Sequence, residues 1–91
     1  MQTDTKLAVL KRFRRIEGQV RGLARMVDED RYCIDIVTQI SAARAALRRA
    51  EEEILNDHVA HCVEHAIASG NQEDQRQKIA EIMEVLARSD R

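Results

Sequence analysis

No proline or glycine interrupts the chain between Cys33 and His58. Alanine, arginine, glutamate and leucine, which are good helix formers, fill much of this stretch. We therefore predict one long helix from about Tyr32 to Ala68. With a rise of about 1.5 Å per residue, this helix separates Cys33 from His58 by roughly 37 Å. Because such a helix extends beyond any globule that 91 residues build alone, the sequence predicts an obligate oligomer.

Shorter helices are predicted on both sides of the long one, because apolar residues recur there at steps of three and four. In the first helix they form an apolar stripe that comprises Leu7, Leu10, Phe13, Ile16, Val20, Leu23 and Val27. The first runs from about Asp4 to Val27 and the last from about Gln72 to Arg88. The connecting residues carry the signals of helix ends. Asp30 is predicted to cap the start of the long helix, Gly70 to end it, and Asn71 to cap the start of the last helix.

The composition predicts an all-α protein with a single domain spanning residues 1–91. The chain contains two aromatic residues, three glycines and no proline. Gly18 and Gly22 lie one turn apart where glycine weakens a helix, so we expect a neighbouring backbone to approach there. No apolar signal segment begins the chain, and no run reaches the roughly 20 apolar residues that cross a bilayer. We expect a cytoplasmic protein with no membrane partner and with reduced cysteines.

A metal site is predicted from two residues four positions apart. His58 and Cys62 share one helix face. Two antiparallel copies of the long helix would bring Cys33 of one chain to this pair on the other, and a two-fold axis would create two such sites. The two helices would then cross at a cluster of small residues. These are Ala42, Ala43, Ala45 and Ala46.

The ligand types indicate which metal would bind. Two thiolates and one imidazole are soft ligands, and three of them suffice for Cu(I). Zn²⁺ usually takes four ligands. His61 or His65 would supply the fourth, which keeps Zn²⁺ and Ni²⁺ open as alternatives. The reading without a metal is a pair of apolar thiols beside a solvated row of histidines.

The net charge of −1 hides a strong separation of charge. Residues 1–25 carry seven basic side chains and only two acidic ones, and a second basic cluster lies at 44–49. This pattern favours a polyanionic partner over an ordinary solvated face, and DNA phosphates and DNA shape would carry the recognition. No phosphate-binding loop, nucleophile elbow or acid pair is present, so we predict that the chain is not an enzyme. The candidate DNA-binding residues are Lys11, Arg12, Arg14, Arg15, Arg21, Arg44, Arg48 and Arg49.

Three segments resemble the signatures of a known family. They are LKRFRRIEGQVRGL at 10–23, DRYCIDI at 30–36 and QISA at 39–42. Together they resemble the CsoR/RcnR family, the copper-sensing operon repressors, over nearly the whole chain. The Cys-His-Cys spacing is similar to that of the family's Cu(I) branch.

The resemblance implies a three-helix protomer, an antiparallel four-helix dimer and a homotetramer built from two dimers. It also implies a repressor that binds operator DNA when metal-free and releases it on binding Cu(I), which derepresses copper resistance genes. Tyr32 matches a position that supports the metal ligands. The third-helix glutamate of the Cu(I) branch aligns without gaps to Lys78, which leaves Glu81 as the substitute.

Three alternatives remain open from the sequence. A persulfide- or electrophile-sensing repressor would use Cys33 and Cys62 as an intersubunit pair. A repressor responsive to Ni²⁺ or Zn²⁺ would recruit His61 or His65. A metal-binding buffer would have the same thiols but no operator partner.

Overall fold

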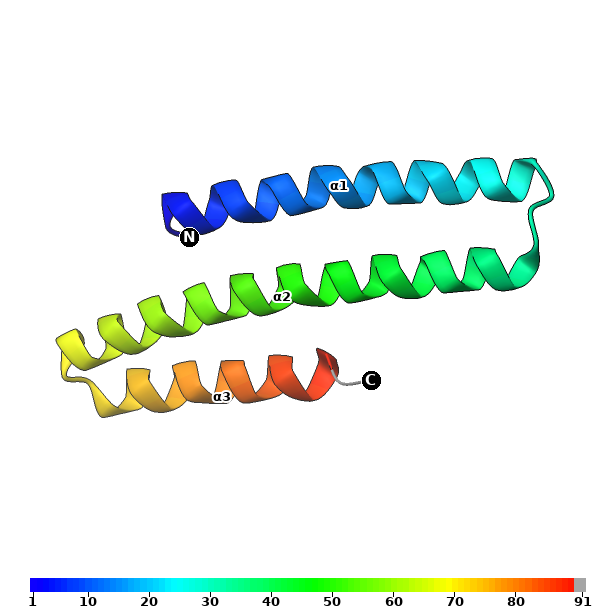
Figure 1. The fold of residues 1–91 in the computed structure, drawn as a ribbon. Coiled ribbons are helices and arrows are strands. Elements are labelled where there is room, and N and C mark those ends of the chain that lie inside the picture. Colours follow the sequence, from blue (N-terminus) through cyan, green and yellow to red (C-terminus); the bar gives the residue numbers. More distant parts are fainter. Residues whose placement is uncertain (90–91) are drawn as a thin grey trace. The chain divides into compact units, whose positions relative to one another are not determined.

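The computed structural model describes residues 1–89, which form three α-helices joined by short turns (Figure 1). Helix α1 spans Thr3–Asp28, α2 spans Cys33–Ser69 and α3 spans Gln72–Ser89. Strands are absent from these 89 residues. The predicted all-α fold is confirmed, and each helix ends within one residue of its predicted bounds.

Helix α2 is continuous over 37 residues, as predicted, and it takes part in two compact units. The first unit comprises residues 1–55, in which α1 lies antiparallel to the N-terminal part of α2 (Figure 1). The second unit begins at Asn56 and combines the C-terminal part of α2 with α3. Cys33 therefore belongs to the first unit, whereas His58 and Cys62 belong to the second.

The turn between α1 and α2 is closed by backbone hydrogen bonds around Asp30. The Arg31 amide donates to the Met26 carbonyl at 2.9 Å, and the Asp30 amide donates to the Val27 carbonyl at 3.1 Å. These two bonds define a Schellman motif, and Asp30 adopts its left-handed conformation with φ of 54°. The prediction that Asp30 caps the start of α2 is therefore wrong, because Asp30 ends α1 and α2 begins only at Cys33.

Replacing Asp30 with glycine is expected to raise the free energy of unfolding by about 0.5 kcal/mol. The left-handed conformation costs an L-residue roughly 1–2 kcal/mol, and the extra freedom of glycine in the unfolded chain offsets part of this gain. Thermal unfolding at a fixed protein concentration measures the change. Asp30→Ala is the control, since it keeps the Cβ atom and should not stabilise. A lower melting temperature for the glycine variant would contradict this account of the turn.

The turn between α2 and α3 is built as the sequence predicts. Gly70 adopts a left-handed φ of 65° immediately after α2, a conformation that glycine adopts without a steric penalty. The Asn71 side chain then caps α3, because its Oδ1 accepts hydrogen bonds from the amides of Glu73 at 3.0 Å and Asp74 at 3.2 Å. The Gln75 side chain donates to the Ala66 carbonyl at 3.1 Å and ties α3 to the end of α2.

Asn71→Ala is expected to lower the free energy of unfolding by about 1 kcal/mol, because two amides at the start of α3 lose their shared acceptor. The loss should show in the melting temperature and in the helical circular dichroism signal. Asn71→Asp keeps an acceptor oxygen at the same place and should stay close to the parent. Equal destabilisation by both substitutions would mean that the cap is not the cause.

Few side chains are buried in the single chain. The buried hydrophobic residues are Val9, Ile16, Ala43, Ala50 and Ala66. Of the apolar stripe predicted on α1, only Ile16 is among them, whereas Val20 is 54% exposed. Val37 on α2 and Met83 on α3 are 57% and 63% exposed. Each helix thus carries apolar surface that the described chain leaves uncovered. Within residues 1–89, no helix combines the length and the apolarity needed to cross a membrane.

Two packing predictions need correction. A Cβ atom on Gly22 would meet nothing within 4 Å, and one on Gly18 would meet only the Arg21 side chain at 4.0 Å. No neighbouring backbone in the described chain approaches these glycines, so the prediction of close packing there is wrong for the single chain. Ala43 is already buried within the chain, whereas Ala42 and Ala45 are exposed and remain available for the predicted helix crossing.

Candidate metal centre and nucleic-acid interface

His58 and Cys62 lie one turn apart on α2 and their side chains are in contact. The Cys62 Sγ atom lies 3.3 Å from His58 Nε2 and 3.8 Å from Nδ1. His58 is exposed and Cys62 is half-buried. A thiolate and an imidazole at such spacing are two soft donors for one metal ion, and their exposure leaves room for a further ligand.

Cys33, the third predicted ligand, is the first residue of α2 and is an exposed free thiol. Within residues 1–89, no three histidine, cysteine or acidic side chains come together in a way that could hold a metal ion. One chain therefore brings together two of the three predicted donors and leaves the set incomplete.

The two additional histidines have different surroundings. The His61 Nε2 atom lies 3.8 Å from Asp57 Oδ1, a carboxylate whose side chain is only 7% exposed. His65 is exposed. The structure thus engages His61 with a carboxylate on its own helix, and neither histidine completes a three-ligand group among the described residues.

The residues predicted to support the metal site lie at a helix start and on α3. Tyr32 directly precedes α2 and is 68% exposed. The Glu81 carboxylate lies 3.8 Å from the Lys78 ammonium, one turn away on α3. Glu81, which we predicted to replace the third-helix glutamate of the Cu(I) branch, therefore contacts Lys78, the residue that aligns with that glutamate.

Basic side chains line two shallow hollows in the first unit. One lies on α1 and is lined by Ala8, Lys11, Arg12 and Arg15. The other lies on α2 and is lined by Ser41, Arg44, Ala45 and Arg48. Each hollow is lined by long cationic side chains together with at least one small residue, a combination that suits the oxygens of a phosphate group. The remaining candidates are exposed as well, namely Arg14, Arg21 and Arg49.

Arg12 differs from the other candidates for DNA binding because it forms an ion pair with Glu53 of α2. The two side chains are 28% and 33% exposed. Sequence reasoning missed Glu53, since a contact across 41 residues leaves no local pattern. The only sequence signal was the acidic run 51–53, together with the scarcity of acidic residues in the basic segment 5–25.

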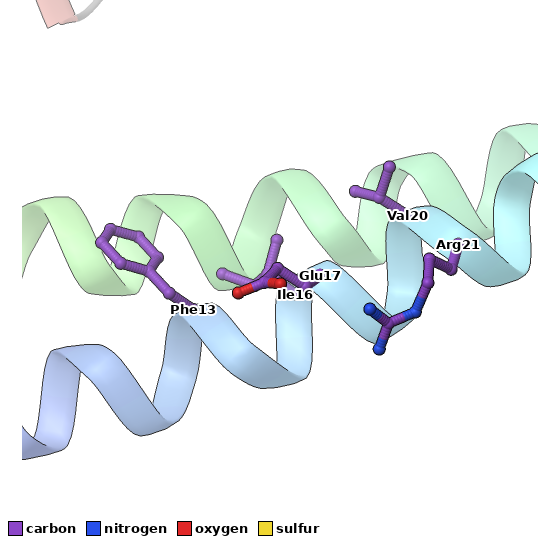
Figure 2. Close-up of a pocket in the computed structure, with 5 residues that line it drawn as sticks. All are labelled: Phe13, Ile16, Glu17, Val20 and Arg21. Carbon is purple, nitrogen blue, oxygen red and sulfur yellow. The ribbon is translucent and has the colours of Figure 1, made fainter.

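An apolar hollow also lies on α1, close to the basic residues (Figure 2). Phe13, Ile16 and Val20 follow one edge of the helix, and the Arg21 side chain lines the same hollow (Figure 2). Glu17 lines the same hollow. Phe13 and Val20 are 37% and 54% exposed, so this edge is apolar surface without a cover in the single chain.

A three-helix chain with a pair of soft donors on its long helix and basic hollows on α1 and α2 fits one known class of protein. Residues 5–88 match the family model of the metal-sensitive transcriptional repressors. The chain belongs to this family of transcriptional repressors, the CsoR/RcnR family.

Within this family, the chain is similar to several copper-sensing repressors. The chain is 54% identical over 68 residues to the copper-sensing transcriptional repressor RicR of Mycobacterium tuberculosis, covering 75% of this chain and 71% of RicR. It is 49% identical over 78 residues to the copper-sensing repressor CsoR of Bacillus subtilis, covering 86% of this chain and 74% of that protein. The fold is similar to the crystal structure of CsoR with Cu(I) from Geobacillus thermodenitrificans. The TM-score is 0.85 at 42% identity, covering 100% of this chain and 92% of the other.

Proposed function

We propose that this chain is a Cu(I)-responsive transcriptional repressor that binds operator DNA when metal-free and releases it when Cu(I) binds. The observation that carries the proposal is the contact between His58 and Cys62, one turn apart on α2 with sulfur and nitrogen 3.3 Å from each other. Two relatives at 54% and 49% identity are copper-sensing repressors, which supports copper as the effector.

The donor set fits Cu(I) when Cys33 of a partner protomer joins His58 and Cys62. Two thiolates and one imidazole satisfy the three-coordinate preference of this soft ion. The exposure of Cys33 and of His58 supports a site that is closed between two chains. A bound Cu(I) ion would act as a soft Lewis acid that links the two protomers. One chain would provide the Cys33 thiolate, and its partner would provide His58 and Cys62.

The exposed apolar surface supports an antiparallel dimer and a homotetramer. Five hydrophobic residues are buried in the described part of the single chain, and three of them are alanines. A core of this size does not stabilise a 91-residue protein. Association with a second copy would cover residues such as Val20, Val37 and Leu47. We propose that the whole chain acts as one domain within that assembly.

The basic residues of α1 and α2 are proposed to contact the operator. Lys11 and Arg15 on α1, together with Arg44 and Arg48 on α2, are exposed beside hollows that suit phosphate groups. Contacts of this kind release counterions, so operator affinity should fall steeply with salt. Cu(I) and DNA would favour different arrangements of the oligomer, and each would weaken the binding of the other by the same factor.

One anaerobic titration tests this function. The reduced, metal-free protein first selects duplexes from a random 25-base-pair library, and its affinity for the selected duplex is then measured by fluorescence anisotropy. We expect Cu(I) to lower this affinity by about 5- to 150-fold, the usual range of allosteric coupling. Zn²⁺ and Ni²⁺ should have little effect. Failure to select any duplex would overturn the repressor proposal and favour a metal buffer.

Thiol chemistry is the second candidate function, and the accessibility of both cysteines favours it. Cys33 is exposed and Cys62 is half-buried beside an imidazole. A thiolate of one protomer would attack an inorganic polysulfide, which breaks an S–S bond, forms a persulfide and releases a shorter polysulfide. The thiolate of the neighbouring protomer would then attack this persulfide, which forms a disulfide between the protomers and releases hydrosulfide. Release of DNA by polysulfide, with Cu(I) inert in the same assay, would select this function. Release by Zn²⁺ or Ni²⁺ would instead bring in His61 or His65 as a fourth ligand.

A further inference from the structure

Arg12 differs from its basic neighbours on α1 because its charge is already compensated. Its Nη2 atom donates to Oε1 of Glu53, which lies 41 residues further along the chain on α2. Within residues 1–89, no other basic side chain of α1 forms an ion pair. The pair is therefore the one ion pair among the described residues that joins α1 to α2.

Moving Arg12 to a DNA phosphate would leave a poorly solvated group behind. The Glu53 side chain is 33% exposed, and its Oε2 atom is buried without a hydrogen-bond partner. The Arg12 Nε atom is buried and unpartnered in the same way. Removing one member of such a pair strands the other with incomplete hydration, which is costly. Lys11 and Arg15 line the same hollow on α1, are exposed and carry no such penalty.

We propose that Arg12 is a positioning residue and does not contact phosphate. With Glu53 it forms an interhelical clasp that sets the register of α1 against α2. The clasp thereby fixes the position of Lys11 and Arg15 on α1 relative to the basic residues of α2. Those residues, Arg44 and Arg48, lie in the same unit. The part of this inference that concerns DNA binding rests on the proposed function.

The salt dependence of DNA binding distinguishes a clasp from a phosphate contact. Each phosphate contact contributes about 0.9 to the slope of log affinity against log salt concentration. Lys11→Ala, the matched control on the same helix, should therefore weaken binding and lower the magnitude of the slope by about 0.9 for each phosphate that is no longer neutralised. Arg12→Ala should weaken binding roughly five-fold and leave the slope unchanged, because only helix alignment is impaired.

A charge swap supplies the second test. In the double variant Arg12→Glu with Glu53→Arg, the ion pair is re-formed with its direction reversed. If the pair is a clasp, affinity should return to within about two-fold of the parent. If Arg12 contacts phosphate, a glutamate there repels DNA and the double variant binds worse than Arg12→Ala. That outcome, or a lowered slope for Arg12→Ala, would overturn the proposal.

Thermal unfolding without DNA separates failure of the clasp from failure of the proposed function. Arg12→Ala and Glu53→Gln should each lower the melting temperature. The variant that combines these two substitutions should have a melting temperature no lower than that of the less stable single variant. Additive losses would show that the two side chains do not act as a unit, and would refute the clasp whether or not the protein binds DNA. Coupled losses in a protein that selects no duplex would keep the clasp and reject the repressor.

Discussion

Replacing His58 with alanine is expected to abolish the response of DNA binding to Cu(I). The imidazole lies 3.3 Å from the Cys62 sulfur, and these two are the predicted donors that residues 1–89 bring together within one chain. Losing a residue that merely supports a ligand already costs about 10- to 100-fold in metal affinity, so loss of a ligand should exceed that range. Competition for Cu(I) against a strong chelator measures affinity, and anisotropy with the selected duplex measures DNA release.

His61→Ala is the matched control for this prediction, because it removes a histidine of the same helix three residues further on. The His61 imidazole is engaged with Asp57 at 3.8 Å, so its removal should leave the Cu(I) response intact. The two variants should bind metal-free DNA equally well. Equal loss of the Cu(I) response in both would contradict a three-ligand copper site and favour a four-ligand site for a divalent ion.

The same variant also tests the thiol alternative. His58→Ala leaves Cys33 and Cys62 in place, so a response to polysulfide would survive it while the response to Cu(I) would not. Survival of both responses would mean that the imidazole takes part in neither, and the His58–Cys62 contact would lose its role in the proposed function.

The helices could be predicted from the sequence because their limits depend on local chemistry. The chain lacks proline throughout, Gly70 offers an accessible left-handed conformation, and Asn71 offers an acceptor to free amides. Asp30 was misassigned for a local reason as well. An aspartate both caps helix starts and tolerates the left-handed conformation that ends a helix. The backbone bonds of Arg31 and Asp30 decide between these two roles, and no residue pattern encodes them.

Contacts between distant segments could not be predicted in the same way. Arg12 lies between the row of exposed basic residues of α1 and the apolar stripe of that helix, and nothing near it in sequence indicates a carboxylate partner. Arg12 differs from the candidates for phosphate binding because the packing of α1 against α2 brings Glu53 next to it. The apolar stripe of α1 shows the opposite limit. Its period was correct, but among the described residues Ile16 is the only member of the stripe that is buried. We propose that a second chain covers the rest, and a contact with another chain leaves no local pattern in the sequence.

The proposed sharing of the metal site between two protomers predicts a result that a site within one chain would not give. In an antiparallel dimer, one site combines Cys33 of the first protomer with His58 and Cys62 of the second, and the other site is its symmetric counterpart. Each homodimer of Cys33→Ala or of Cys62→Ala lacks a ligand at both sites. A mixed dimer of these two variants collects both losses at one site and keeps all three ligands at the other.

Refolding Cys33→Ala and Cys62→Ala together in equal amounts is therefore expected to restore about one quarter of the parent's tight Cu(I) sites, because about half of the dimers are mixed and each regains one of two sites. Anaerobic titration against a strong Cu(I) chelator counts these sites. The control mixture, His58→Ala with Cys62→Ala, should restore none, since each site takes both of these ligands from one chain. If all three ligands came from a single chain, neither mixture would regain a site, and that result would refute the intersubunit site.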